Sequence, residues 1–324
     1  MMNSSDLNNL RSQIEPTLAA LEAERVRQLN ACKVGALWCA GLGALGALVV
    51  AVIGNGINIL MLVPIFIAIV IFSIITSGAK NKYSSGFKQM VTPQLVKNFG
   101  DLTYSPQSGL SESAFNRANL FQNPDRYSSE DLIEGRVGAT RLQMSEVHAE
   151  EKHRRTDSKG RTTTTYTTIF RGLFLIADFN KNFNGITYVV PEGFSGILGS
   201  FGRGIQSLGG TLGGRGALVQ LEDPEFERTF VVYSNDQTEA RYVLSSALMR
   251  RLLNLKQHFN GNVSTAFIGG SLYLMISKND NWFEPPALSA PLTFEGVENT
   301  LRQLQMATGI IENLDLNTRI WSKQ

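Results

Sequence analysis

The chain has 324 residues, of which 43% are hydrophobic, and a formal net charge of +2. This length and composition suffice for at least one sizeable core, and so small a net charge argues against the clustered basic face that nucleic-acid binding uses. The two cysteines, Cys32 and Cys39, lie at the start of and within an apolar stretch. A disulfide scaffold and a cysteine-based zinc site are therefore excluded.

Residues 1–33 predict an amphipathic helix on the cytosolic side of a membrane. Apolar residues recur there at three- and four-residue steps, which is the period of one helix face. The stripe consists of Leu7, Leu10, Ile14, Leu18 and Leu21. Pro16 interrupts it and predicts a short helix before the proline and a longer one after it. The stripe needs a partner, either the chain's own cytosolic domain or a second subunit in a coiled coil, which would make a homo-oligomer.

Residues 34–76 contain no Asp, Glu, Lys, Arg or His and predict two membrane-spanning helices. A bilayer core needs about 20 apolar residues in a helix, and residues 34–53 and 59–76 meet this need. A short polar loop joins them, so we expect a helical hairpin in the lipid bilayer. Lysine and arginine flank the hairpin and are absent from the loop, which predicts that both termini lie in the cytosol. The flanking residues are Arg25, Arg27, Lys33, Lys80, Lys82 and Lys88.

The two predicted spans favour an anchor over a pore, because they offer little polar chemistry beyond Ser73 and Thr76. Residues 41–46 have the form of a dinucleotide fingerprint but lack the preceding strand that this motif requires. Their small side chains predict close packing of the two helices. Pro64 lies inside the second span and predicts a kink there.

The remainder of the chain predicts an α+β fold. We expect a helical connector over residues 77–133, with helices at 84–99 and 111–121, the latter capped by Ser111. Residues 134–284 then form a cytosolic α+β domain. Its β-branched and aromatic runs predict strands at 137–147, 163–178, 186–190, 219–221, 229–233, 265–268 and 272–277, with a helix at about 237–259. Residues 285–324 form a last helix and a tail. This order is typical of a mostly antiparallel sheet with packed helices.

Three segments of the chain resemble the bacterial family catalogued as domain of unknown function 3137. They are FRGLF, ADFNK and GIT within residues 170–187, EDPEFE at 222–227 and DQTEARY at 236–242. The likeness extends over about residues 79–284. It implies a protein of the bacterial inner membrane, with no established activity, catalytic residue or cofactor to transfer. It also implies a LemA-type membrane protein as a candidate partner.

Metal-capable side chains gather at Glu146, His148 and Glu150. In an extended strand these three share one face, which could form a metal site. The spacing is not that of zinc enzymes, and a solvated hairpin edge is the favoured reading. The acidic residues around Asp223-Pro224 predict a turn, and Asp236 predicts a helix cap. We therefore expect no cofactor.

Residues 193–216 are rich in glycine and serine and carry an apolar stripe at helical spacing. The stripe is formed by Phe194, Ile197, Leu198, Phe201, Ile205, Leu208 and Leu212. Such a helix is poor in water because glycine costs about 1 kcal/mol relative to alanine. We expect it to be stabilised in the cytosolic leaflet, with a loop or a protein contact as alternatives.

These features together favour a membrane-anchored binding module over an enzyme. Its surfaces would bind lipid or a membrane-protein partner. The alternatives are an enzyme that acts on a membrane-associated substrate, which needs a polar cleft with perturbed carboxylates or histidines, and a subunit of a transport or envelope assembly.

Overall fold

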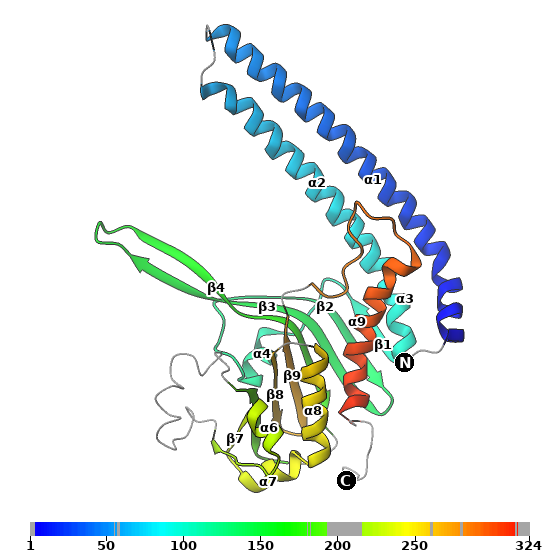
Figure 1. The fold of residues 1–324 in the computed structure, drawn as a ribbon, viewed down its shortest axis with the longest axis vertical. Helices are drawn as coiled ribbons and strands as arrows, with labels where there is room; N and C mark the ends of the chain where they lie inside the picture. The colour runs from blue at the N-terminus through cyan, green and yellow to red at the C-terminus, as the bar shows by residue number, and fades with distance from the viewer. Residues whose placement is uncertain are drawn as a thin grey trace. The chain divides into compact units, whose positions relative to one another are not determined.

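The computed structural model describes residues 4–54, 56, 59–179, 181, 183–192, 216–259, 262–278, 281–314 and 316 (Figure 1). The chain divides into two compact units. The first unit comprises Met1–Leu95 and Glu284–Arg302, and the second comprises Val96–Phe283 and Gln303–Gln324. The fold is α+β, as expected, with long helices at the N-terminus and a large antiparallel sheet.

The first unit is built on a helical hairpin. Helix α1 spans Ser4–Ile53, and a short 3-10 turn at Ile59–Met61 leads into α2, Leu62–Met90, which runs beside α1 (Figure 1). Helix α3, Thr92–Val96, follows. The expected break at Pro16 is wrong, because α1 continues through this residue. Buried apolar residues on both sides of Pro16 offset the backbone hydrogen bond that proline cannot donate.

The apolar stripe of the N-terminal helix is buried in its own chain. Leu10, Ile14, Leu18 and Leu21 are each at most 5% exposed, and Leu7 is half-buried. Leu21 packs on α2, since a Cβ placed on Gly86 would lie 3.1 Å from its Cδ2 atom. The stripe therefore has a partner within the first unit and does not require the second subunit of a coiled coil.

Glycines set how closely α1 approaches α2. A Cβ on Gly43 would lie 3.1 Å from the Ala68 Cβ, and one on Gly46 would lie 2.7 Å from the Pro64 Cβ. This supports the packing role expected for residues 41–46. Pro64 lies in the first turn of α2, where the missing N–H has no partner within the helix, so the proline requires no kink.

An ion pair attaches the C-terminal strap, residues 284–293, to α1. The Arg25 guanidinium donates two hydrogen bonds of 2.7 Å to the Glu22 carboxylate and a third, also 2.7 Å, to the Leu288 carbonyl. The Leu292 N–H in turn donates to Glu22 Oε2 at 2.8 Å. The hydrogen bonds from Arg25, and then that from Leu292, lower the pKa of Glu22 against an opposing effect of burial.

A second contact attaches the strap to α2. Lys88, which is only 6% exposed, places its Nζ atom 2.7 Å from Glu284 Oε1. The Ser84 hydroxyl donates to the other oxygen of Glu284 at 2.8 Å. Tyr83 is buried on the same helix, and burial raises its pKa to about 12. The strap is thus held by charged groups on both helices of the hairpin.

Among the residues described, the second unit contains one antiparallel sheet, whose strands differ in length. Nine strands lie in the order β1-β2-β3-β4-β9-β8-β5-β7-β6 (Figure 1). Their bounds are β1 Asp101–Ser105, β2 Arg126–Val137, β3 Thr140–Thr156, β4 Thr162–Asp178, β5 Ile186–Pro191, β6 Ala217–Leu218, β7 Phe230–Ser234, β8 Asn262–Ile268 and β9 Ser271–Ser277. The helices are α4 Glu112–Ala118, α6 Pro224–Thr229, α7 Gln237–Val243 and α8 Ser246–Phe259, and the unit division falls within α9, Phe294–Asn313.

The centre of the sheet is covered on both faces. On one face α4 contributes Phe115 to a cluster with Phe170, Phe174 and Tyr273 of the strands. On the other face, neighbouring residues of β4 such as Leu173 and Leu175 are fully buried too. This double burial explains why the central strands read as continuous apolar runs and not as an alternation.

Two strands lie in the range for which a helical connector was expected. Both β1 and most of β2 precede residue 134. The sequence of β2 hides its alternation, because the inward positions Tyr127, Ser129 and Asp131 include polar residues and Asp131 falls at a bulge. The helix expected at 111–121 is present but ends at Ala118, because Asn119 adopts the left-handed conformation; Ser111 caps it as expected by accepting the Ala114 N–H.

The region after β5 differs from expectation in two places. The expected strand at 219–221 is wrong, since β6 ends at Leu218 and Glu227 accepts the Leu221 N–H. The helix expected at 237–259 is two helices. Leu244 leaves the helical conformation, and the Ser245 hydroxyl accepts the Leu248 N–H at the start of α8. A local side-chain acceptor thus begins a new helix.

We predict that Gly46→Ala lowers the melting temperature of the full chain in detergent, because its methyl group would collide with the Pro64 ring. Overpacking of this kind costs about 1–3 kcal/mol. Gly41→Ala is the matched control, since its Cβ would meet nothing within 4 Å. Equal melting temperatures for the two variants would contradict the tight approach.

We predict that the strap loosens in acid. A lowered pKa means that Glu22 stabilises the strap fully above its ordinary value of 4.5 and loses this effect as the pH falls through its folded pKa. Hydrogen exchange of residues 286–293, corrected for intrinsic rates, should rise in this range. Glu22→Gln should raise exchange roughly tenfold already at neutral pH, as expected for losing charged hydrogen bonds. Glu298→Gln, in the exposed pair with Arg302, should not.

Candidate functional site

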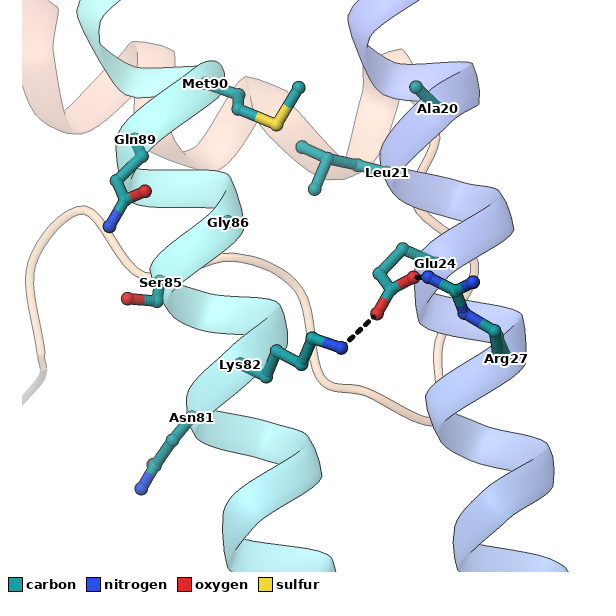
Figure 2. A pocket seen from close by; sticks show the side chains of 10 residues that line it. All are labelled: Ala20, Leu21, Glu24, Arg27, Asn81, Lys82, Ser85, Gly86, Gln89 and Met90. Carbon is teal, nitrogen blue, oxygen red and sulfur yellow. Dashed lines mark ion pairs between the residues drawn. The ribbon is translucent and has the colours of Figure 1, made fainter.

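A pocket opens between α1 and α2 at the base of the hairpin. Its volume is about 650 Å³, and it is lined by Ala20, Leu21, Glu24, Arg27, Asn81, Lys82, Ser85, Gly86, Gln89 and Met90 (Figure 2). All these residues belong to the first unit. The lining combines apolar side chains with several charged and polar ones.

One carboxylate and two cations dominate the electrostatics of this pocket. Lys82 reaches across from α2 and places its Nζ atom 3.0 Å from Glu24 Oε1 (Figure 2). Arg27 forms an ion pair with the same carboxylate, and Gln28 donates to it at 2.7 Å. The Glu24 side chain is only 19% exposed, whereas those of Arg27 and Lys82 are 73% and 63% exposed. The pocket therefore presents positive charge to its surroundings.

Helical spacing brings these residues together. On α1, Ala20, Glu24 and Arg27 follow each other at four- and three-residue steps, and on α2, Lys82, Gly86 and Gln89 do the same. Gly86 lets Leu21 lie against the α2 backbone. Met90 points toward Leu21 across the gap (Figure 2). Leu21 and Met90 thus lie toward one end of the pocket, and the charged residues Glu24, Arg27 and Lys82 lie toward the other (Figure 2).

A second cavity of about 720 Å³ lies between the same two helices, in the apolar part of the hairpin. Its lining includes Ala31, Val34, Gly35 and Trp38 of α1 and Ile67, Ala68, Ile71 and Ile75 of α2. On α1 the steps from Arg27 to Ala31, Gly35 and Trp38 continue the stripe of the first pocket. The two cavities therefore share one face of the hairpin.

The sequence did not predict this site. Arg27 and Lys82 were expected only to orient the hairpin, and no role was expected for Glu24. The helical steps between Ala20, Glu24 and Arg27 are visible in the sequence. Which residues of α2 face them depends on the packing of the two helices, which the sequence does not show.

The predicted metal residues lie on β3 and contact different partners. Glu146 accepts the Trp282 N–H at 2.8 Å, and the His148 Nε2 atom lies 2.9 Å from the Thr168 hydroxyl. Glu150 pairs with Arg126 at 3.2 Å. The three side chains are thus each engaged in the sheet by a separate neighbour.

Within the described part of the chain, Glu146 instead approaches Glu130 and Asp131, with ligand oxygens within 4.8 Å of one another. Asp131 lies at the β2 bulge and accepts the Tyr104 hydroxyl at 2.5 Å. The two buried carboxylates, Glu146 and Asp131, therefore have donors supplied by the fold.

Asp223 and Asp236 cap α6 and α7, each accepting two backbone N–H groups, so their roles are structural. The apolar stripe Phe194, Ile197, Leu198, Phe201, Ile205, Leu208 and Leu212 lies outside the described residues. Its contact with the cytosolic leaflet stays a prediction.

Comparison with known proteins yields one structure and one family. A crystal structure of the mycobacterial trehalose monomycolate transport factor A, TtfA, is similar to this chain at 8% sequence identity, over 68% of this chain and 92% of that chain, with a TM-score of 0.33. No curated protein matches. The family described as "Protein of unknown function (DUF3137)" matches residues 168–316, from within β4 into the residues that follow α9. The chain therefore resembles this family from β4 to α9, which confirms the likeness found in the sequence within the matched range.

Proposed function

We propose that this protein is a membrane-anchored module whose α1–α2 hairpin spans the bilayer and tethers the α+β domain beside the cytosolic leaflet. The observation that carries this proposal is a band of large apolar side chains exposed on both helices. The structure has two helices long and apolar enough to cross a membrane.

The apolar band is unusual for a surface in contact with water. Leu37 and Ile53 of α1 are 75% and 81% exposed, and Phe66 and Ile74 of α2 are both 67% exposed. Soluble proteins rarely expose contiguous apolar patches of this extent. In lipid the same side chains need no further partner. The Thr76 hydroxyl donates to the Phe72 carbonyl at 2.8 Å, which satisfies its hydrogen within the helix.

Exposed cations support the proposed orientation. Lys33 precedes the apolar part of α1, Lys80 follows that of α2, and both are exposed. Gly54 and Gly56 at the opposite end carry no charge. The positive-inside rule therefore supports a cytosolic position for the base of the hairpin and for both termini. With the family resemblance, this supports the bacterial inner membrane as the location.

The surface that supports a binding role is the β3–β4 arm, residues 151–167. The pairing of β3 with β2 ends at Glu150, and the pairing of β4 with β9 begins at Gly172. Among the described strands, the residues of the arm therefore pair only with each other, and the arm projects from the sheet (Figure 1). It carries five Lys and Arg and two carboxylates, a formal net charge of +3. Asp157 orders its tip by accepting the N–H groups of Lys159 and Arg161. We propose that the arm binds the anionic lipid surface, with a membrane-protein partner of LemA type as the alternative.

Cysteine labelling tests the anchor. In a chain with Cys32 and Cys39 replaced by serine, Gly54→Cys should react with an impermeant maleimide added to the periplasmic side, and Ser158→Cys only after the membrane is opened. Lys159→Cys, adjacent on the arm, should behave as Ser158→Cys does. Labelling of both ends from one side, or release of the chain by alkaline carbonate, would refute the hairpin.

Hydrogen exchange tests the arm. The full chain is placed in nanodiscs of phosphatidylcholine, with or without phosphatidylglycerol. We expect the arm to be protected only when the anionic lipid is present, and to lose this protection in high salt because exposed charges are then screened. Arg154→Gln with Arg155→Gln should abolish it, while Thr163→Gln with Thr165→Gln should not. Protection that appears only when a copurified membrane protein is added would favour that partner.

A further inference from the structure

Two cavities follow one another along one face of the hairpin, a polar one at its base and an apolar one in its apolar part, and we call the two together the groove. We propose that this groove binds one anionic phospholipid, with its phosphate between Arg27 and Lys82 and an acyl chain along the apolar part. The inference rests on the proposed membrane-spanning hairpin and adds a specific ligand to it.

The polar end has the charge that a phosphate requires. Glu24 is mostly buried and contacts both Arg27 and Lys82, so it positions the two cations. The single negative charge of Glu24 offsets only one of the two positive charges of Arg27 and Lys82. A guanidinium carries five N–H donors and an ammonium three, and both remain largely exposed. Donors are thus left for a phosphate, which binds such groups through charge-assisted hydrogen bonds.

The apolar end has the shape that an acyl chain requires. Small side chains, Ala31, Gly35 and Ala68, lie between bulky ones such as Trp38 and Ile71, which leaves the cavity of about 720 Å³. Trp38 is 67% exposed and lies one turn inside the predicted span. Tryptophan is enriched at this depth, where the hydrocarbon meets the headgroups.

The depth of the cations matches the headgroup layer. Arg27 precedes Val34 by seven residues, about 10 Å along a helix axis, and Lys82 follows Thr76 by six, about 9 Å. The headgroup region adds about 5–8 Å to each side of the hydrocarbon core. Long cationic side chains reach over the remaining few ångströms.

The opposite groove of the hairpin supports a phospholipid over a partner helix. That groove, of about 470 Å³, is lined by residues such as Ala40, Ala44 and Ile65 and by no charged side chain. A partner helix could enter either groove through apolar packing. Among the cavities described, only the apolar one that includes Ala31 and Gly35 follows the cationic pocket of Arg27 and Lys82 on the same face of α1.

The experiment measures phospholipid retained by the full chain after purification in mild detergent, by native mass spectrometry with phosphatidylglycerol or phosphatidylcholine added. We expect about one phosphatidylglycerol per chain. Arg27→Gln with Lys82→Gln should reduce this retention at least tenfold. Lys33→Gln with Lys80→Gln removes two cations at the same ends of the helices but outside the groove, and should retain the lipid.

A second pair of variants tests the apolar end. Ala31→Leu should fill the channel and reduce retention, whereas Ala40→Leu, in the opposite groove, should not. Equal retention by the Arg27/Lys82 and Lys33/Lys80 variants, or equal retention of both lipids, would overturn the proposal. Alkaline extraction separates the two claims, because a chain that stays in the membrane but retains no lipid refutes only the lipid site.

Discussion

The close approach of α1 and α2 is the constraint on which the first unit depends. Gly43 and Gly46 leave no room for a side chain against Ala68 and Pro64, so the helices meet at these points. Gly43 and Ala68 also line both apolar cavities, one on each side of this contact. The grooves of the hairpin are therefore a consequence of where small residues stand in α1.

Two arginines near the base of α1 show how helix phase separates their roles. Arg25 is 5% exposed and binds Glu22 and the strap, so its charge is used inside the first unit. Arg27, two residues later, points to a different side and remains exposed beside Glu24. Residues two apart on a helix do not share a face. Arg25 therefore attaches the strap to α1, whereas Arg27 contributes an exposed positive charge to the pocket.

Four acidic residues of the second unit accept hydrogen bonds from backbone N–H groups. Asp223 and Asp236 begin helices, Asp157 orders a turn, and Glu146 accepts the N–H of Trp282. Each carboxylate has a structural task that its position in the fold requires. A cluster of acids in the sequence is thus weak support for catalysis here, whereas the exposed apolar side chains of the hairpin support the proposed membrane anchor.

The sequence by itself determined the elements that depend on local pattern. The apolar spans, the cap at Ser111 and the long strand β4 follow from composition and periodicity, and the family resemblance follows from short motifs. The sequence did not predict β2, because Asp131 and a bulge hide the alternation of apolar and polar residues. It also did not predict that α1 continues past Pro16, which depends on apolar residues buried on both sides of the proline. Only the tertiary structure decided that Glu24 meets Lys82 and that Glu22 and Lys88 hold the strap, because these pairs join segments far apart in the chain. Such pairing depends on the rotation of one helix against another, which no local pattern encodes.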